Sequence, residues 1–383
     1  MTIRYISDTD GLAAMESSLG GARRIALDCE AAGYHRYSDR VCLIQLTAGD
    51  ETFLVDPLGV DPGPALRPIL EDESVEVVMH GADFDLRLLD RDLDIRLRGL
   101  FDTQIAASLL GVAGLGLQSL LEVRLAVSVS KRFQRADWAR RPLPDEMKEY
   151  AALDTIYLDR LANDLARELE DRGRLDWARE EFRELEGVRF EERENDDPVA
   201  RVRAARDLAP REVARLREAL EWRDEVARER DRAPFRVVGN GPLVEVARRG
   251  PRSTRDLSNV QGLSGQLVQE HGEELLAGLR SADSLPESEI EGYPRDESGG
   301  RGRPPPEVEA RMAHLKQVRN SRAESLGIDR GTLLPNSTLQ ALAESPPTSL
   351  SELAQADGIR TWQAELLGED LVEALRQTMA TGT

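Results

Sequence analysis

From about residue 22 to 110, short apolar runs alternate with segments in which apolar residues recur every three or four positions. The runs predict strands, and the periodic segments predict helices. We therefore expect strands over residues 24–28, 40–46, 52–56 and 76–79. The first three follow one another closely, as in a meander, and helices link the later elements, which is typical of an α/β domain.

Beyond Leu115 the periodicity is helical throughout, and residues 144–187 predict helix. A carboxylate-rich stretch then ends at Pro198, where we expect the first domain boundary. Further along, residues 240–280 align without a gap on residues 336–376, an offset of 336 − 240 = 96 positions. The matched pairs include Asn240 with Asn336, Leu243 with Leu339, Gly262 with Gly358 and Leu275 with Leu371. This repeat predicts two copies of a helical module of about 75 residues, a size that can fold alone.

The segment between the two copies, residues 284–306, is rich in Pro, Gly, Ser and charge, which is the composition of a linker. The expected organisation is an α/β domain over residues 1–197 and all-α domains over residues 207–283 and 307–383.

Composition narrows the class of protein. Of 383 residues, 51 are basic and 71 acidic, so the net charge is 51 − 71 = −20. No stretch approaches the roughly 20 apolar residues of a membrane span, and the first ten residues lack a signal core, so we expect a cytoplasmic protein without a membrane partner. Cys29 and Cys42 are expected to be reduced core residues. The charge disfavours casual binding to nucleic acid, but the basic residues are nearly all Arg, which contacts phosphate bidentately in local patches.

The first candidate site lies at the end of the first predicted strand. Asp28 and Glu30 are two positions apart, so both carboxylates lie on one face, and Cys29 points the opposite way. Two adjacent acids repel each other unless a cation lies between them, which suits a divalent ion with oxygen ligands. Solvated carboxylates at a strand end are the alternative, because such short motifs recur by chance.

A second acidic position follows the fourth predicted strand, where a His-Gly turn leads into a helix. Asp85 lies in the first turn of that helix and could project towards the strand ends, while Asp83 competes as a residue that caps the helix. Either Asp could instead only complement the helix dipole, and His80 could simply pack or hydrogen-bond at the turn.

Tyr150 and Asp154 are four positions apart, one turn from each other on one face of a predicted helix. A phenol beside a metal-binding carboxylate can orient a water molecule towards a phosphorus atom; a half-buried Tyr with its hydroxyl in solvent is the alternative. With Asp28, Glu30 and Asp85, Asp154 completes the carboxylate set that a pair of divalent ions about 3.5–4 Å apart requires. No phosphate-binding loop, nucleophilic Ser motif or His-based zinc motif competes in the sequence.

Five blocks, in order, resemble the DEDDy group of 3′–5′ exonucleases and the ribonuclease D family within it. They are Asp28-Cys-Glu30, His80-Gly-Ala-Asp-Phe-Asp85, Leu100-Phe-Asp-Thr-Gln-Ile-Ala-Ala107, Ala136-Asp-Trp-Ala-Arg-Arg-Pro-Leu143 and Tyr150-Ala-Ala-Leu-Asp154. The two helical modules resemble HRDC domains, and a tandem pair after the nuclease is the arrangement of ribonuclease D. The resemblance implies an α/β fold: a ribonuclease H-like exonuclease domain with a mixed sheet, followed by two small all-α HRDC-like domains.

The resemblance also implies roles. Asp28, Glu30 and Asp154 would hold the ion nearer the attacking water, Asp28 and Asp85 would bind a second ion, and Tyr150 would orient the water. The two divalent ions would be Mg²⁺ or Mn²⁺. The chain departs from the family pattern at Met147, where Gln is expected, and in the few basic residues of its second module, which weakens the case for RNA binding there.

A single-stranded 3′ end is usually held by base stacking and phosphate contacts. The candidates for these contacts are His80, Lys131, Gln134, Trp138, Arg140, Arg223 and Arg248. Trp138 is equally a candidate core residue, and some Arg side chains of the first module are expected to pair with the abundant Glu.

The sequence therefore predicts a metal-dependent 3′–5′ exoribonuclease that releases 5′-nucleoside monophosphates from RNA with a single-stranded 3′ end. Precursors of tRNA are the expected substrates, and a monomer is the expected state. Two alternatives stay open, a 3′–5′ exodeoxyribonuclease and a catalytically inert scaffold that binds nucleic acid.

Overall fold

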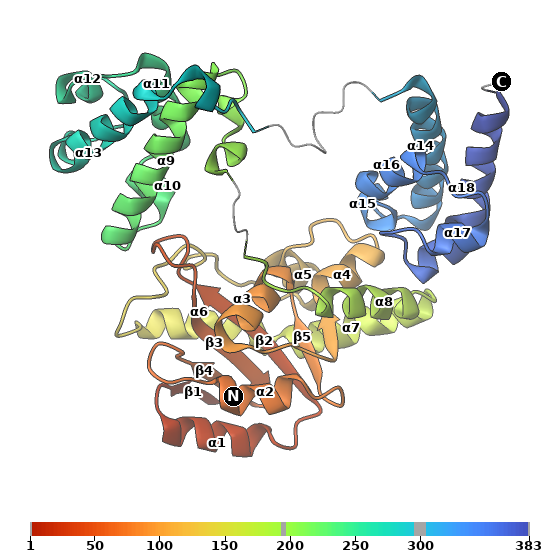
Figure 1. Ribbon diagram of the computed structural model, residues 1–383. Coiled ribbons are helices and arrows are strands. Elements are labelled where there is room, and N and C mark those ends of the chain that lie inside the picture. Colours follow the sequence, from red (N-terminus) through yellow and green to blue (C-terminus); the bar gives the residue numbers. More distant parts are fainter. Residues whose placement is uncertain (1, 193–196, 295–303, 382–383) are drawn as a thin grey trace.

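The computed structural model describes residues 2–192, 197–294 and 304–381. Figure 1 shows three parts in chain order: a domain built around a β-sheet, a green-to-cyan helical module and a blue helical module. The middle of the predicted linker, residues 295–303, lies outside the described residues. None of the helices within the three ranges is long and apolar enough to cross a membrane.

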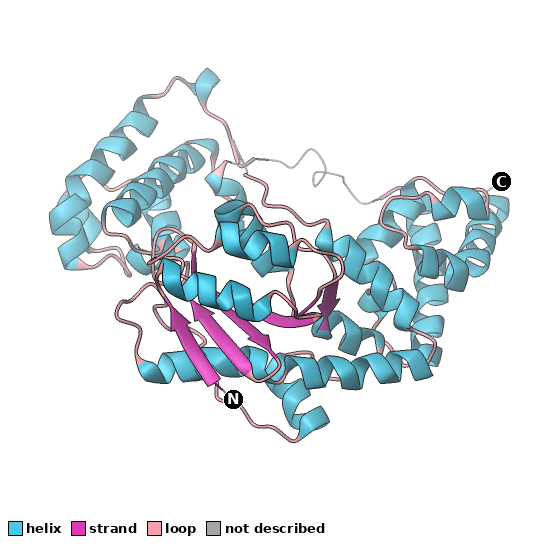
Figure 2. Cartoon of the chain, turned by 90° about the horizontal axis from the view of Figure 1, so that it is seen from below, coloured by secondary structure: helices cyan, strands magenta, loops and turns pink. Residues whose placement is uncertain are grey.

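The described sheet has six strands in the order β1-β4-β3-β2-β5-β6. Their bounds are β1 (Thr2–Ile6), β2 (Arg24–Ala31), β3 (Val41–Ala48), β4 (Glu51–Val55), β5 (Glu76–Met79) and β6 (Leu100–Asp102). β3 is antiparallel to β2 and β4, whereas the β1–β4, β2–β5 and β5–β6 pairs are parallel. Helices lie above and below the strands in Figure 2, which is why the apolar side chains of the central strand β3 are fully buried.

The apolar runs predict β2 to β5 but miss the first and last strands. β1 is an edge strand whose first three residues are exposed, so it lacks the buried alternation that marks a strand. β6 has only three residues, too few for a period to show. The predicted α/β class with a mixed sheet is nevertheless confirmed.

The helices of the sheet domain are α1 (Thr9–Leu19), α2 (Gly63–Leu70), α3 (Asp83–Leu93), α4 (Thr103–Leu109), α5 (Leu117–Leu125), α6 (Asp145–Ile156), α7 (Leu158–Asp171) and α8 (Leu175–Glu186). The helical stretch predicted over 144–187 is thus divided into three helices. α7 ends just before Gly173, because the φ of 66° at this glycine is incompatible with a right-handed helix. α6 packs across β2, β3 and β4. A buried hydrogen bond of 2.7 Å joins Thr155 Oγ1 on α6 to Thr47 Oγ1 on β3 and fixes α6 over the sheet.

The first helical module comprises α9 (Pro210–Glu229), α10 (Pro234–Val237), α11 (Asn240–Arg249), α12 (Thr254–Ser258) and α13 (Gly265–Ser284). The second comprises α14 (Pro306–Leu326), α15 (Arg330–Leu333), α16 (Asn336–Glu344), α17 (Leu350–Ala354) and α18 (Thr361–Thr381). Each helix of the second module begins 96 positions after its counterpart, as for 306 − 210 and 361 − 265. The predicted repeat is therefore confirmed as two copies of one helical fold.

The two modules differ in how their cores are built. The first has a hydrophobic core of its own, which starts at Val199 and ends at Leu279. The core of the second is continuous with that of the sheet domain. At this contact the rings of Trp177 on α8 and Trp362 on α18 stack, with centroids 4.7 Å apart and an interplanar angle of 17°.

Candidate active site

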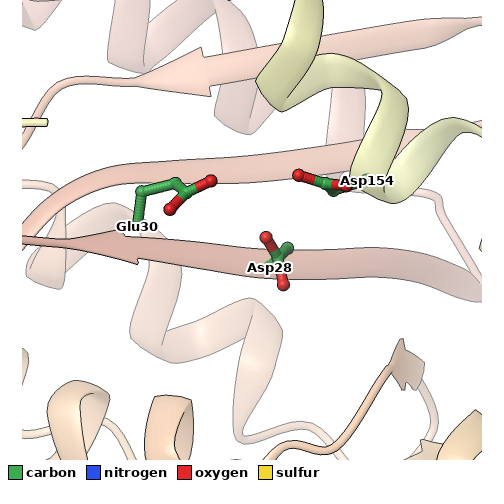
Figure 3. A group of neighbouring side chains, drawn as sticks. All are labelled: Asp28, Glu30 and Asp154. Carbon is green, nitrogen blue, oxygen red and sulfur yellow. The ribbon is translucent and has the colours of Figure 1, made fainter. Parts of the chain in front are cut away.

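Three acidic side chains meet between strand β2 and helix α6 (Figure 3). Asp28, Glu30 and Asp154 each offer a carboxylate oxygen, and these oxygens all lie within 4.8 Å of one another. The alternation along β2 places Asp28 and Glu30 on the face that α6 covers, as the sequence predicts. A group of three such oxygens suits a divalent cation with oxygen ligands, so these residues fit the ion that the motifs imply.

Asp85 supplies the fourth carboxylate but lies outside this group of three. It is 9% exposed and sits in the first turn of α3, behind a turn in which Gly81 has a φ of 69°. Its charge contributes to the raised pKa of Asp28, so the two carboxylates are neighbours electrostatically. The capping role considered for Asp83 is wrong, because the N-cap residue is Ala82, and Asp83 instead pairs with Arg87 at 3.1 Å on the surface.

The pKa values describe a site that needs positive charge. Burial, followed by repulsion from the other carboxylates, raises the pKa of Asp28 and of Glu30 well above the ordinary range. Burial also raises the pKa of Asp85 and of Asp154 to about 7. Burial and mutual repulsion both disfavour the ionised form of these carboxyl groups. A bound cation offsets both effects, so the site favours cation binding.

Tyr150 lies one turn before Asp154 on α6 and is half-buried. Its ring contacts those of Phe133 and Trp138, with centroids 5.8 and 6.1 Å away. Burial, and then the charges of Asp154, Glu30 and Asp28, raise the pKa of the phenol. Tyr150 is therefore a neutral hydrogen-bond donor beside the carboxylates at neutral pH.

Several residues that hold the site have no assigned role in the sequence analysis. Asp102 accepts hydrogen bonds from the backbone N–H groups of Ala82, at 2.8 Å, and of Gln104. Thr103 Oγ1 donates to the carbonyl of Met79 and lies 2.9 Å from His80 Nδ1. The block Leu100–Ala107, noticed only for its resemblance, thus anchors the turn that leads to Asp85.

Gln45 was also missed. It lies on β3 directly opposite Asp28, is fully buried, and neither atom of its side-chain amide has a hydrogen-bond partner in the described part of the chain. A polar residue inside the apolar run 41–46 is the signal that could have found it.

A buried ion pair supports the segment before α6. Arg141 donates to both carboxylate oxygens of Asp56 at 2.6 Å and to the carbonyl oxygens of Cys42 and Trp138 at 2.7 Å. Tyr5 Oη donates to the same carboxylate. Although burial alone would raise the pKa of Asp56, the hydrogen bonds from Arg141 and Tyr5 lower it.

Two of the predicted substrate contacts need correction. Trp138 is 2% exposed and packs in the core beneath α6, so its indole has no free face for a base. Arg223 is half-buried and donates to the carbonyl of Val238 and to Asn240 Oδ1. In the second module Arg319 donates to Leu334 and Asn336 in the same way, so this Arg pair braces the repeat.

The other predicted contacts lie where solvent reaches them. Lys131, Gln134 and Arg140 are exposed on the segment between α5 and α6, and Arg248 is exposed at the end of α11. His80 is half-buried against Thr103, and burial lowers the pKa of its imidazole. His80 therefore supports the turn, and its role as a substrate contact stays a prediction.

Family comparisons agree with this division of the chain. Residues 3–170 match the 3′–5′ exonuclease family, and residues 212–279 and 308–375 each match the HRDC domain. The sheet domain that carries the four carboxylates is thus the exonuclease domain, and the two helical modules are HRDC domains.

Whole proteins of known family match over almost the full length. Ribonuclease D of Pseudomonas paraeruginosa is 31% identical over 97% of this chain and 97% of that protein. Ribonuclease D of Escherichia coli is 34% identical over 76% of this chain and 77% of that protein. The crystal structure of Escherichia coli RNase D, an exoribonuclease involved in structured RNA processing, matches with a TM-score of 0.71 and 29% identity over 98% of this chain and 99% of that one. Together with the acidic centre and the tandem HRDC domains, these matches establish that the chain belongs to the ribonuclease D family.

Proposed function

We propose that this chain removes 5′-nucleoside monophosphates from the 3′ end of RNA by metal-dependent hydrolysis. The observation that carries the proposal is the group of carboxylate oxygens from Asp28, Glu30 and Asp154 within 4.8 Å of one another. The proposal includes two ions, Mg²⁺ or Mn²⁺, the first held by these three residues and the second by Asp28 and Asp85. The ions supply Lewis acidity and neutralise the charge of the phosphate.

The protein's own groups would divide the remaining work. The phenol of Tyr150, one turn from Asp154, would donate a hydrogen bond that orients the attacking water. Lys131, Gln134, Arg140 and Arg248, with His80 at the turn, would contact the RNA strand. The substrates would be RNAs with single-stranded 3′ ends, tRNA precursors among them. The proposal extends to a monomer that acts in the cytoplasm, with domain limits at 1–197, 207–283 and 307–383.

A direct test follows a 5′-labelled single-stranded RNA and the matching DNA with Mg²⁺, Mn²⁺ or EDTA present. The wild type should shorten the RNA from its 3′ end only with metal, and Asp28→Ala should abolish the ladder. Asp83→Asn is the matched control, because Asp83 is an exposed Asp on α3 that pairs with Arg87, and this variant should keep full activity. Shortening of DNA alone would favour an exodeoxyribonuclease, and two intact substrates under every condition would favour the inert scaffold.

A further inference from the structure

An aromatic and basic cluster lies where the first HRDC domain meets the exonuclease domain. Tyr34 belongs to the turn that follows β2, Arg135 to the segment before α6, and Phe235 and Arg236 to α10. In Figure 1 the red turn after β2 reaches towards α10. We call these four residues the Tyr34 platform.

The four side chains form one cluster centred on the ring of Tyr34. The rings of Tyr34 and Phe235 have centroids 5.4 Å apart at an interplanar angle of 58°. The guanidinium carbons of Arg135 and Arg236 lie 5.7 and 5.4 Å from the centroid of the Tyr34 ring. Both distances fall within the range of a cation–π contact, so positive charge is held against the aromatic surface.

The platform is open to solvent and keeps its charge available. Tyr34 is 41% exposed and Phe235 is 53% exposed. Within the described residues, neither Arg135 nor Arg236 forms an ion pair, whereas neighbouring Arg228 pairs with Asp224 at 2.7 Å. In a chain of net charge −20, two unpaired guanidinium groups against exposed rings form a local site for a polyanion.

Other contacts already hold the two domains together at this junction. The N–H of Ala233 donates to the carbonyl of His35 at 3.1 Å, and Arg36 bonds to Asp231. Tyr37 Oη donates to Asp224 Oδ2 at 2.8 Å. These polar contacts join the two domains independently of the platform rings.

The platform is also close to the chemistry. Tyr34 follows Glu30 by four residues, and an extended chain advances at most about 3.6 Å per residue, so their Cα atoms lie within about 14 Å of each other. An RNA strand whose 3′ end lies at the carboxylates and whose upstream part runs towards this turn would meet the platform.

We propose that the Tyr34 platform binds single-stranded RNA, with an upstream base stacked on the exposed rings of Tyr34 and Phe235 and the adjacent phosphates facing Arg135 and Arg236. This binding site deepens, and rests on, the proposed exoribonuclease function. Stacking of bases on aromatic side chains beside cations is the usual way to hold a single strand without reading its sequence. The site is built from both domains, so it also gives the first HRDC domain a share in the substrate.

The test compares the wild type with Tyr34→Ala and Phe235→Ala on a 12-nucleotide oligoadenylate and on a dinucleotide. Loss of one stacking contact should raise KM for the longer RNA on the order of 10-fold and leave kcat nearly unchanged. Hydrolysis of the dinucleotide, which lacks the upstream nucleotides, should change much less. Phe190→Ala is the matched control, because Phe190 is 39% exposed with Arg91 over its ring at 5.1 Å but is not part of the platform, and it should behave as wild type.

A second measurement locates the stacked base. Single abasic nucleotides placed along the oligoadenylate should weaken wild-type binding most at one upstream position, and Tyr34→Ala should lose this sensitivity at that position only. Tyr37→Phe removes the hydrogen bond to Asp224 but leaves the platform rings, so a small effect is expected. Equal losses on the dinucleotide, or a changed small-angle scattering profile for Tyr34→Ala, would assign the rings a structural role and overturn the proposal.

The platform and the proposed function can fail separately. Fluorescence anisotropy of the labelled oligoadenylate in EDTA measures binding without turnover. Weaker binding by Tyr34→Ala supports the platform even if the wild type hydrolyses no RNA, an outcome that would overturn the proposed function alone. Unchanged binding together with active wild-type enzyme would overturn the platform alone.

Discussion

Asp28, Glu30 and Asp154 lie together between β2 and α6, with Asp85 as an electrostatic neighbour. Burial raises the pKa of all four, and repulsion from the other carboxylates adds to this for Asp28 and Glu30, so the ionised groups cost the folded state free energy at neutral pH unless a cation binds. The sequence places Asp28 and Glu30 on one face of a strand, but only the packing of α6 brings Asp154 to them. A site of this kind couples cation binding to stability.

Metal-free protein should therefore become less stable as the pH rises. The pKa values of Asp85 and Asp154 are about 7 in the folded state and about 3.9 in an unfolded chain, so the folded state binds more protons between these limits. Stability is then highest below about pH 4 for these groups and is lost as the pH passes through 7. In EDTA, the melting temperature should fall less between pH 5 and pH 8 for Asp154→Asn than for the wild type. Mn²⁺ should raise the wild-type melting temperature more at pH 8 than at pH 5. If the melting temperatures of the wild type and Asp154→Asn fell equally with pH in EDTA, the prediction would be wrong.

Replacement of Tyr150 separates water orientation from metal binding. Tyr150→Phe keeps the ring against Phe133 and Trp138 but removes the neutral donor, so kcat should fall on the order of 100-fold with KM little changed. Stabilisation by Mn²⁺ should persist, because the carboxylates are intact. Tyr157→Phe, at the junction of α6 and α7, is the matched control and should retain activity. A Tyr150→Phe enzyme as active as this control would remove Tyr150 from the proposed machinery.

At the scale of secondary-structure elements, contacts of the segment before α6 hold the candidate site in place. Arg141 joins the carboxylate of Asp56 to the carbonyl groups of Cys42 and Trp138, and Trp138 in turn packs on Tyr150. The position of the Tyr150 phenol thus depends on an ion pair between residues 85 positions apart.

Loss of Arg141 should cost both stability and rate. The side chain of Asp56 is 5% exposed, so Arg141→Met would leave a buried carboxylate unpaired and lower the free energy of unfolding by about 3–5 kcal/mol. Arg132→Met is the matched control: Arg132 pairs with Glu146 on the surface, with 67% and 65% of the side chains exposed, and should cost less than about 1 kcal/mol. Urea denaturation measures both, and kcat should fall only for Arg141→Met. Similar losses in the two variants would argue against the bracing role of Arg141.

The sequence predicts features that depend on residues close together in the chain, and it misses those that depend on contacts between distant residues. The short-range pattern of apolar residues predicts strands β2 to β5 and the helix that carries Tyr150 and Asp154. The exposed edge strand β1 and the three-residue β6 carry too little pattern. In the same way, the motif carboxylates are visible because spacing defines them, whereas the support from Asp102 to Ala82 joins residues 20 positions apart. The pairing of Asp83 with Arg87, four positions apart on α3, is by contrast a local contact that the spacing alone could have predicted.

At the scale of the whole molecule, the two HRDC domains have the same fold but pack against the catalytic domain in different ways. The second shares its hydrophobic core with the exonuclease domain, and Trp362 lies at the centre of the contact, 3% exposed. The carboxylate of Glu180 accepts hydrogen bonds from the N–H groups of Thr361 and Trp362, and the indole of Trp362 donates to Glu181 at 3.0 Å. The first domain, whose hydrophobic core is separate, meets the catalytic domain through polar contacts around residues 35–37 and through the rings of Tyr34 and Phe235.

This asymmetry predicts which parts unfold together. Trp362→Ala should remove the stack with Trp177 and destabilise α8 and the exonuclease core along with the second HRDC domain, by about 3–5 kcal/mol for a buried Trp. Hydrogen exchange would show faster exchange in both α7–α8 and α14–α18, with α9–α13 unchanged. Trp222→Ala is the counterpart, because Trp222 is buried in the separate core of the first HRDC domain, and its effect should stay within α9–α13. If Trp362→Ala instead loosened only α14–α18, the shared core would not act as one cooperative unit, and the second HRDC domain would be an attachment rather than part of the catalytic fold.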